Sequence, residues 1–480
     1  EGNGTFNFYD GIIKGKTAIN GNLSAKEKGY EVITTEENEI ETAILGNLPV
    51  AKIGEKEYYT FQEAFDACPS DGTETTVEVL RNCTTDMANI IEENKNIVLD
   101  IQSYKIVSGI ENLFTNNGKF KIVDSIGNGR IISAKGTILK NEETGNFAIN
   151  NITMQMTGSS AIDETIENKG MLEVTGGVII SDGLKNKCIN NIEQGTVKIT
   201  GGTVSAYTYA IYNTSSSRVE IEGGTVQATY YYEGYSAIYN NTENGVVEIK
   251  GGLVTNQGKA IENKKGTIKV TGGEIRTTQG DTRYSECGIY NNGKVIIEDG
   301  KIAALYRGSG IQNEGGTIEI TGGTVSAPEW YNSIINRGTL EISGGTIKSN
   351  QKGIYNNSTL KMTGGTVEVQ ESKSYNYAAL ECGGGTATIE GGTIKYNNTG
   401  NTNYNTAAII ITTNTATLTL GKEDGNVSIT NPEIIGSRYG INNEGNGTLK
   451  RIPKKSFYWY KRVIATNGEN LSLEGLDLYE

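Results

Sequence analysis

The sequence predicts an all-β protein that winds into a right-handed parallel β-helix, or β-solenoid, with about 24 residues per three-strand coil and one short capping helix. The main observation is a Gly-Gly turn followed by a β-branched pair. Copies or variants of it begin at Gly176, Gly201, Gly223, Gly251, Gly272, Asp299, Gly322, Gly344, Gly364 and Gly391. Self-similarity at this period is typical of repeat proteins, in which each unit buries its apolar edge only against its neighbours.

One coil is readable in residues 210–228. Val219, Ile221 and Val226 alternate with polar residues, which is the period of a half-buried strand. The glycine pair at 223–224 permits the positive φ of a sharp corner, and the preceding Ala-Ile-Tyr-Asn stretch supplies a third strand. Because parallel crossovers have a preferred hand, the winding is expected to be right-handed.

An Asn ends the third strand of coil after coil. Stacked about 4.8 Å apart, these amides are expected to form a structural ladder of side-chain hydrogen bonds. The ladder is predicted for Asn191, Asn213, Asn240, Asn263, Asn291, Asn313, Asn336 and Asn356. Tyr212 and Tyr239 come just before two of these residues, so their rings are expected to stack if adjacent coils align.

A helix is predicted between Tyr59 and Gly72. Thr60 and Glu63 have the spacing of a capping box, and Phe61 and Phe65 fall on one side with Ala64 and Cys68. An amphipathic helix at this point is expected to cover the open end of the solenoid, whose bare strand edges otherwise invite aggregation.

The chain is predicted to have four parts. Residues 54–100 hold the capping helix and the first coils, residues 101–448 the parallel β-helix, and residues 449–480 a basic and aromatic C-terminal cap or assembly tail. Residues 1–53 contain strand-like pieces without a repeat anchor. Since EGNGT occurs at 1–5 and again at 444–448, we expect residues 1–53 to complete a preceding solenoid, upstream in a longer precursor or in another subunit. Candidate assembly residues are Phe6, Phe8, Tyr9, Phe457, Tyr458, Trp459 and Tyr460.

Composition excludes several partners. The formal net charge is −13, which disfavours nucleic acid, and no apolar run reaches the roughly 20 residues that insertion into a membrane requires. The start at Glu1, without Met or a signal peptide, favours a processed product or an excised segment. Five widely spaced Cys form neither a disulfide framework nor a zinc signature, although Cys68 and Cys83 leave one disulfide open.

Enzymatic activity is not expected. The chain has no His, which removes the commonest general base and metal ligand, so we predict no catalytic residue, metal or cofactor. Glu298 and Asp299 are the adjacent acids that come closest to a catalytic pair, but acids at an exposed turn are usually solvated.

Binding is the favoured use of the longest loops, because these are rich in aromatic residues. The candidate binding residues are Tyr207, Tyr209, Tyr230, Tyr231, Tyr232, Tyr235, Trp330 and Tyr331. The competing interpretation is that these rings merely cover the apolar edges of the loops.

The TGGTVSA and AIYN anchors, with VAKIG at 50–54 leading into YYTFQEAFDACPSDG, carry a family resemblance over roughly residues 50–448. In these motifs the chain resembles secreted or cell-surface parallel β-helix proteins of the pectin-lyase-like kind from clostridia-type Gram-positive bacteria. The resemblance implies export and exposure at the cell surface.

We therefore expect a non-enzymatic extracellular structural or adhesive surface protein, a rigid β-helical rod with aromatic loops. The alternatives are a subunit of a head-to-tail extracellular fibre and, third, a polysaccharide-active β-helix enzyme. Expected partners are other copies of the chain and a glycan or a host or cell-surface protein, with no nucleic acid and no membrane insertion.

Overall fold

The computed structural model describes residues 6–8, 12–15, 23–25, 30–37, 40–158, 164–184, 186–230, 234–278, 286–328, 330–371, 377–398, 406–421, 432–437, 439–451 and 463–465. Strands make up 62% of it, and α1 (Phe61–Ala67) is the only helix in the described residues. The prediction of an all-β solenoid with one short helix is confirmed. The chain divides into two compact units, Glu1–Asp182 and Gly183–Glu480, which are described in turn.

The first unit begins with two small sheets. Strand β1 (Phe6–Phe8) pairs in parallel with β3 (Leu23–Ala25), whereas β2 (Ile12–Gly15), β5 (Ile40–Asn47) and β4 (Tyr30–Glu37) form an antiparallel sheet. Both are separate from the sheet of the solenoid. That these residues complete a preceding solenoid stays a prediction.

A hairpin and the helix lead into the coils. Strand β6 (Ala51–Ile53) pairs with β7 (Lys56–Tyr58) and with the first coil strand, in both cases antiparallel. Helix α1 has the expected capping box, in which the Thr60 hydroxyl accepts from the Glu63 N–H and the Glu63 carboxylate accepts from the Thr60 N–H. At its other end the buried Lys95 ammonium donates to the carbonyls of Asp66 and Cys68, which satisfies backbone groups that the helix leaves unpaired.

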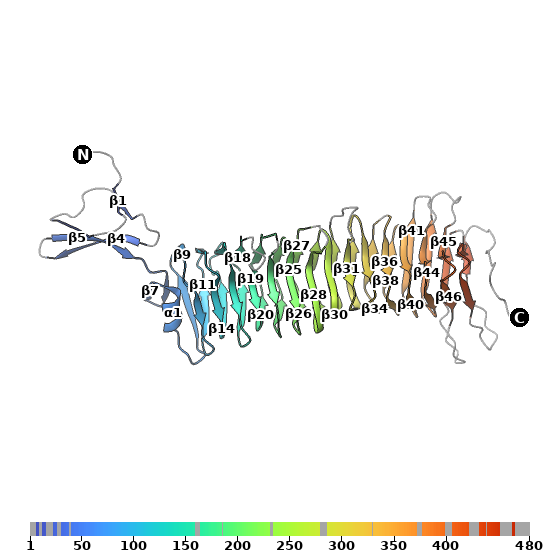
Figure 1. Cartoon of the computed structure of the whole chain (residues 1–480), viewed down its shortest axis with the longest axis horizontal. Helices are drawn as coiled ribbons and strands as arrows, with labels where there is room; N and C mark the ends of the chain where they lie inside the picture. Colours follow the sequence, from blue (N-terminus) through green and yellow to red (C-terminus); the bar gives the residue numbers. More distant parts are fainter. Residues whose placement is uncertain are drawn as a thin grey trace. The chain divides into compact units, whose positions relative to one another are not determined.

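The coils of the first unit stack parallel strands in three columns (Figure 1). The first column holds β8 (Glu74–Val79), β11 (Asn96–Asp100), β14 (Lys119–Val123), β17 (Asn146–Asn150) and β20 (Met171–Val174). The second holds β9 (Cys83–Thr85), β12 (Lys105–Ser108), β15 (Arg130–Ser133), β18 (Thr153–Met156) and β21 (Val178–Ser181). The third holds β10 (Asn89–Ile91), β13 (Asn112–Asn116), β16 (Thr137–Asn141) and β19 (Glu164–Asn168).

Aromatic rings fill the start of this coil interior. Phe65 of α1 is fully buried, and its ring centroid lies 6.2 Å from that of Phe114 and 5.8 Å from that of Phe120. Phe147 of the next coil packs 5.7 Å from Phe120. The helix therefore inserts its apolar side into the solenoid interior, as a cap does.

The second unit has the same three columns, again parallel. The first column holds β23 (Thr196–Ile199), β26 (Arg218–Ile221), β34 (Thr317–Ile320), β37 (Thr339–Ile342), β40 (Thr359–Met362), β43 (Thr386–Ile389), β46 (Thr417–Leu420) and β49 (Thr448–Arg451). The second holds β24 (Thr203–Ala206), β27 (Thr225–Ala228), β29 (Leu253–Asn256), β35 (Thr324–Ala327), β38 (Thr346–Ser349), β41 (Thr366–Glu371), β44 (Thr393–Asn398), β47 (Glu433–Gly436) and β50 (Val463–Ala465). The third holds β22 (Lys187–Asn191), β25 (Tyr209–Thr214), β31 (Cys287–Asn291), β33 (Ser309–Asn313), β36 (Asn332–Asn336), β39 (Lys352–Asn356), β42 (Ala378–Cys382), β45 (Ala407–Ile411) and β48 (Tyr439–Asn443).

Some strands of this unit continue around a corner from one column to the next. They are β28 (Ser236–Ile249), β30 (Lys259–Thr277) and β32 (Lys294–Ala304). Their pairing shows register shifts at the corners, for example between Val270 and Thr271. The repeat pattern predicts separate short strands here, whereas β28, β30 and β32 are each one continuous strand that bends at the corner.

The Gly-Gly corner requires both glycines, for different reasons. Gly224 has a φ of 72°, which residues with a side chain rarely adopt. A Cβ on Gly223 would lie 2.4 Å from the carbonyl oxygen of Thr200 in the neighbouring coil. The first glycine therefore permits close stacking and the second permits the turn.

The interior is apolar, with Val219, Ile221, Val226 and Ile238 all at 0% exposure. All five Cys are free thiols in the structure, and Cys188 is buried among apolar residues as a small side chain. Among the described residues no helix has the length and apolarity needed to cross a membrane.

Candidate functional site

Asparagine side chains form a continuous row inside the third column of the second unit. In each pair the Nδ2 of one Asn donates to the Oδ1 of the next at 2.7 to 2.9 Å, and every member is at 0% exposure. Neighbours are 20 to 28 residues apart in the chain. The row comprises Asn191, Asn213, Asn240, Asn263, Asn291, Asn313, Asn336 and Asn356. In the first unit Asn116, Asn141 and Asn168 are joined in the same way.

The residue before each Asn points to the opposite face of the strand, because side chains alternate along a strand. These residues are called the outward row. Pairing register places Asn190, Tyr212, Tyr239, Glu262, Tyr290 and Gln312 in consecutive coils. Unlike the inner row, the outward row varies from coil to coil.

Six tyrosines gather where the outward row meets the loops that enter it. This tyrosine cluster consists of Tyr207, Tyr209, Tyr212, Tyr230, Tyr235 and Tyr239. The Tyr212 and Tyr239 rings stack with centroids 4.7 Å apart and planes 8° apart, which confirms the expected stacking. Tyr209 contacts Tyr212, Tyr235 and Tyr239 edge-on at 5.2 to 5.7 Å.

Two further ring contacts extend the cluster along the loops. Tyr207 lies 4.7 Å from Tyr230, and Tyr230 lies 5.3 Å from Tyr235. All six rings are half-buried. Part of each ring is therefore covered by its neighbours, as the competing interpretation expects, and part faces solvent.

Charged side chains border the cluster. The Lys187 ammonium lies 4.6 Å from the centroid of the Tyr212 ring, a cation–π contact. In the next coils Glu262 is 2% exposed, and its Oε1 lies 2.8 Å from the Lys264 ammonium and 3.3 Å from that of Lys259. Both ammonium groups also lie over the Tyr290 ring, at 5.5 and 4.3 Å.

Three tyrosine hydroxyls in and beside the cluster have a raised pKa. Burial, followed by the nearby Glu262 carboxylate, raises the pKa of Tyr209 well above its ordinary value, and burial likewise raises the pKa of Tyr239 and Tyr290. The Tyr209 hydroxyl donates to the carbonyl of Gly234 and so anchors the long loop. Tyr209 therefore supports the cluster, whereas Tyr207 and Tyr230 lie on the loops.

The predicted binding residues do not all meet. The structure brings together Tyr207, Tyr209, Tyr230 and Tyr235, whereas Tyr231 and Tyr232 lie outside the described residues. Trp330 is 46% exposed and contacts the ring of Tyr377, over which Lys352 lies at 4.7 Å. Tyr331 is half-buried beside it in the chain.

Most of the predicted assembly residues lie outside the described part of the chain. Phe6 and Phe8 lie in strand β1. Tyr9, Phe457, Tyr458, Trp459 and Tyr460 lie outside the described residues.

The two adjacent acids singled out from the sequence have different neighbours. Glu298 forms an ion pair with Lys269 at 3.1 Å, and Asp299 is in register with Thr271. In the described part of the chain, no group of three or more His, Cys, Asp or Glu residues could hold a metal ion.

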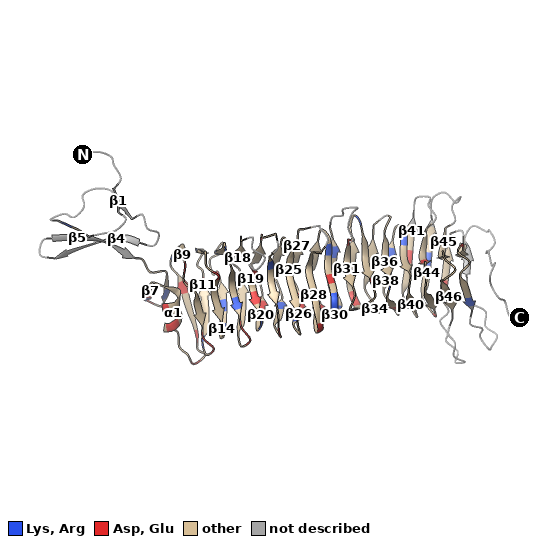
Figure 2. Ribbon diagram, in the orientation of Figure 1, with Lys and Arg blue, Asp and Glu red and all other residues tan. Residues whose placement is uncertain are grey.

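Charges of both signs are interspersed over the coils (Figure 2). Many pair between neighbouring coils, as do Lys198 with Glu222 and Lys294 with Glu319, at 3.2 and 2.7 Å.

Comparison with known proteins finds only short similarities. No family model and no solved structure matches the chain. A stretch of 39 residues, 7% of the chain, is 64% identical to the aryl-phospho-beta-D-glucosidase BglH of Bacillus subtilis (strain 168) and covers 8% of that protein. Another similarity, 55% over 42 residues, is to the 6-phospho-beta-glucosidase AscB of Escherichia coli (strain K12), covering 8% of the chain and 9% of that protein. The chain thus spans less than a tenth of the length of these relatives.

Proposed function

We propose that the chain is a non-enzymatic, extracellular structural or adhesive protein of the cell surface, whose solenoid presents the tyrosine cluster to a glycan. The observation that carries the proposal is the packing of six half-buried tyrosines on one corner of the coils. Sugars bind such surfaces because their apolar C–H faces pack on aromatic rings.

Polar groups around the rings fit the same ligand. Tyrosine hydroxyls both donate and accept hydrogen bonds, and Lys187 and the Glu262–Lys264 pair lie beside them. A site of rings with a few polar groups is the usual composition of a small-ligand site. Because the rings brace one another, little side-chain freedom remains to be lost on binding.

The extracellular location is part of the proposal and is supported by the resemblance in the TGGTVSA and AIYN repeats. An enzymatic function is not proposed, because the similarity to phospho-glucosidases covers only 7 to 9% of the chain. The fibre alternative requires coils that stack end to end. Helix α1 packs Phe65 into the interior of its coil, which favours the adhesive proposal over stacking at that end.

The experiment compares glycan-array binding by the full chain with that of the double variant Tyr207→Ser/Tyr230→Ser. These rings contact each other on the loops, and Tyr209, which anchors the loop, stays in place. We expect at least a tenfold loss of binding, since each aromatic contact contributes about 1 kcal/mol.

The matched control is Tyr306→Ser, because Tyr306 is 71% exposed and outside the cluster. It should bind like the parent, and all three proteins should melt at similar temperatures. Equal binding by parent and double variant would remove the cluster from the proposal, and a chain that binds no glycan would refute it.

A further inference from the structure

The three strands of the first coil, β8, β9 and β10, differ in whether their outer edge is covered. Strand β8 is covered by β6, which pairs with it in antiparallel fashion. Strand β10 is covered by the helix, because the Gln62 amide donates from Nε2 to the Ile90 carbonyl and accepts at Oε1 from the Ile90 N–H, at 3.2 and 2.6 Å. Strand β9 pairs only with β12 among the described strands. Among the described residues, one of the three edges is therefore left open.

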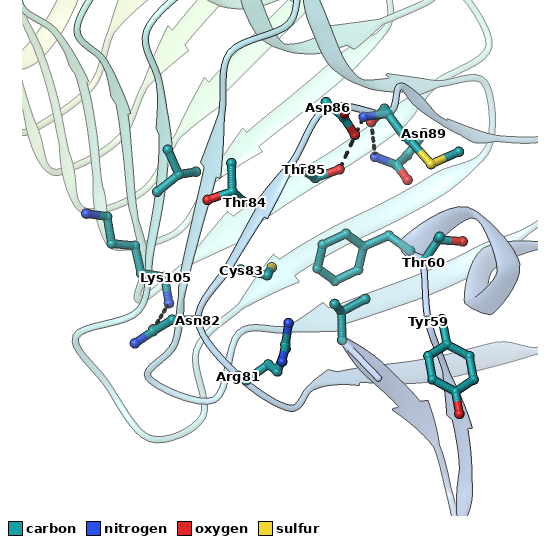
Figure 3. Close-up of a pocket in the computed structure, with 14 residues that line it drawn as sticks. Tyr59, Thr60, Arg81, Asn82, Cys83, Thr84, Thr85, Asp86, Asn89 and Lys105 are labelled. Carbon is teal, nitrogen blue, oxygen red and sulfur yellow. Dashed lines mark hydrogen bonds between the residues drawn. The ribbon is translucent and has the colours of Figure 1, made fainter. Parts of the chain in front are cut away.

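A hollow of about 740 Å³ lies beside this open edge (Figure 3). Arg81, Cys83 and Thr84 line one side of it, and Tyr59 and Thr60 line the other. Val50 and Phe61 add apolar surface. The hollow thus combines a free strand edge with room for side chains.

Arg81 brings a positive charge without a partner. Its Nε is buried and has no hydrogen-bond partner, and the guanidinium forms no ion pair within the described residues. Burial raises the pKa of the Cys83 thiol to about 11, so this neighbour is neutral and supplies no counter-charge. Asp86 also lines the hollow but is exposed. A guanidinium that has an unpaired, buried Nε and no counter-charge is suited to a two-point hydrogen bond with a carboxylate.

We propose that this hollow is a docking site for an extended acidic peptide, which adds as a strand to the open edge of β9 and pairs one carboxylate with Arg81. Strand addition uses the backbone for affinity and side-chain pockets for specificity. Here the edge of β9 offers the backbone groups, and Arg81 selects the acidic side chain. The site lies in the first unit and does not depend on the tyrosine cluster of the second.

The test uses the full chain and a fluorescein-labelled heptapeptide of alternating Thr and Val with Glu at its centre, followed by fluorescence anisotropy. Binding should weaken at least about tenfold in Arg81→Gln, because a hydrogen bond to a charged group is lost. It should be unchanged in Arg130→Gln, which alters an exposed arginine on β15 of the same unit.

Two altered peptides keep the test decisive if Arg81→Gln does not fold. A peptide with Gln in place of the Glu should bind to the parent protein at least about tenfold more weakly than the parent peptide does. A peptide with N-methyl groups on alternate residues cannot add as a strand and should not bind. Equal binding of parent and N-methylated peptides, or displacement of the parent peptide by trigalacturonate at the same concentration, would overturn strand addition in favour of simple carboxylate recognition.

Discussion

Two neighbouring positions on the third column of the second unit differ in how much the residue type varies from coil to coil. The inner position is Asn in every coil from Asn191 to Asn356, and its amide is fully buried. The outward position is Tyr212 in one coil, Glu262 in another and Gln312 in a third. One residue along the strand separates a position defined by hydrogen bonding from one that is free to vary.

The difference follows from what each side chain must satisfy. A buried amide that lacks a partner costs the full desolvation of its polar groups, so each Asn requires another Asn in the next coil. An outward side chain meets solvent and loops, and needs only to fit beside its neighbours. The inner row therefore sets the register of the coils, while the outward row is available for recognition.

The largest expected effect is the loss of stability when an asparagine of the inner row is replaced. In Asn240→Leu the Oδ1 of Asn263, the Nδ2 of Asn213 and the carbonyl of Lys265 all lose their hydrogen bond to Asn240. We expect the free energy of unfolding to fall by about 3 kcal/mol or more, measured by urea denaturation.

Its control is the next residue, Tyr239→Leu, which removes a stacked ring but leaves no buried polar group unpaired. The loss should be about 1 kcal/mol. Equal losses for the two variants would mean that the inner row has no special role.

The second effect concerns the corners that keep both rows aligned. Gly224→Ala places a Cβ 2.7 Å from the carbonyl oxygen of Gly202, at a φ of 72°. Gly315→Ala also acts at positive φ, but its Cβ meets nothing within 4 Å. Thermal and urea unfolding should show a loss of about 3 kcal/mol for the first and about 1 kcal/mol for the second. A Gly315→Ala loss as large as that of Gly224→Ala would show that φ alone, and not coil stacking, requires the glycine.

The third effect tests whether the tyrosine cluster behaves as buried structure. Tyr209→Phe removes the hydrogen bond to Gly234 and should cost about 1 kcal/mol near neutral pH. Since burial raises the folded-state pKa of Tyr209 above the ordinary value of 10.0, the unfolded chain loses this proton first. The free energy of unfolding should therefore fall as pH rises past 10, and less steeply in Tyr209→Phe than in the parent. Parallel pH profiles of the two proteins, measured by urea unfolding, would argue against a protected hydroxyl.

The smallest effect is expected on the outer face of the first column. Glu298→Gln breaks the ion pair with Lys269, but both side chains are partly exposed, at 46% and 34%. Stability should change by about 0.5 kcal/mol or less, and the difference from the parent should shrink as salt is added. A loss comparable to that of Asn240→Leu would indicate a role for Glu298 beyond the surface.

The sequence predicts what neighbouring repeats impose on one another. The glycine doublets indicate the corners and the spaced Asn residues indicate the third strand, because both are repeated in coil after coil. Thr60 with Glu63 indicates the helix, because a capping box needs only residues that are close in sequence. It does not predict that β30 bends through three columns, nor that Gln62 covers the edge at Ile90, 28 residues away.

The candidate site was predicted only in part for the same reason. Aromatic composition singles out Tyr207 and Tyr230, but it does not show that Tyr209 supports the others, because that depends on how loops of different coils fold together. The unpaired state of Arg81 has no sequence signal, since this arginine is distinguished only by the absence of a hydrogen-bond partner for its buried Nε among the described residues.

The row of asparagines also has a direction. Each Nδ2 donates toward the following coil, and the row stops at Asn356, where Cys382 takes the next place and the amide donates instead to the carbonyls of Ser358 and Thr386. One amide cannot turn over without breaking the hydrogen bonds on both of its sides. The orientation chosen in one coil is therefore inherited by the next, and the aligned amide dipoles make the solenoid interior electrically polar from end to end of the row.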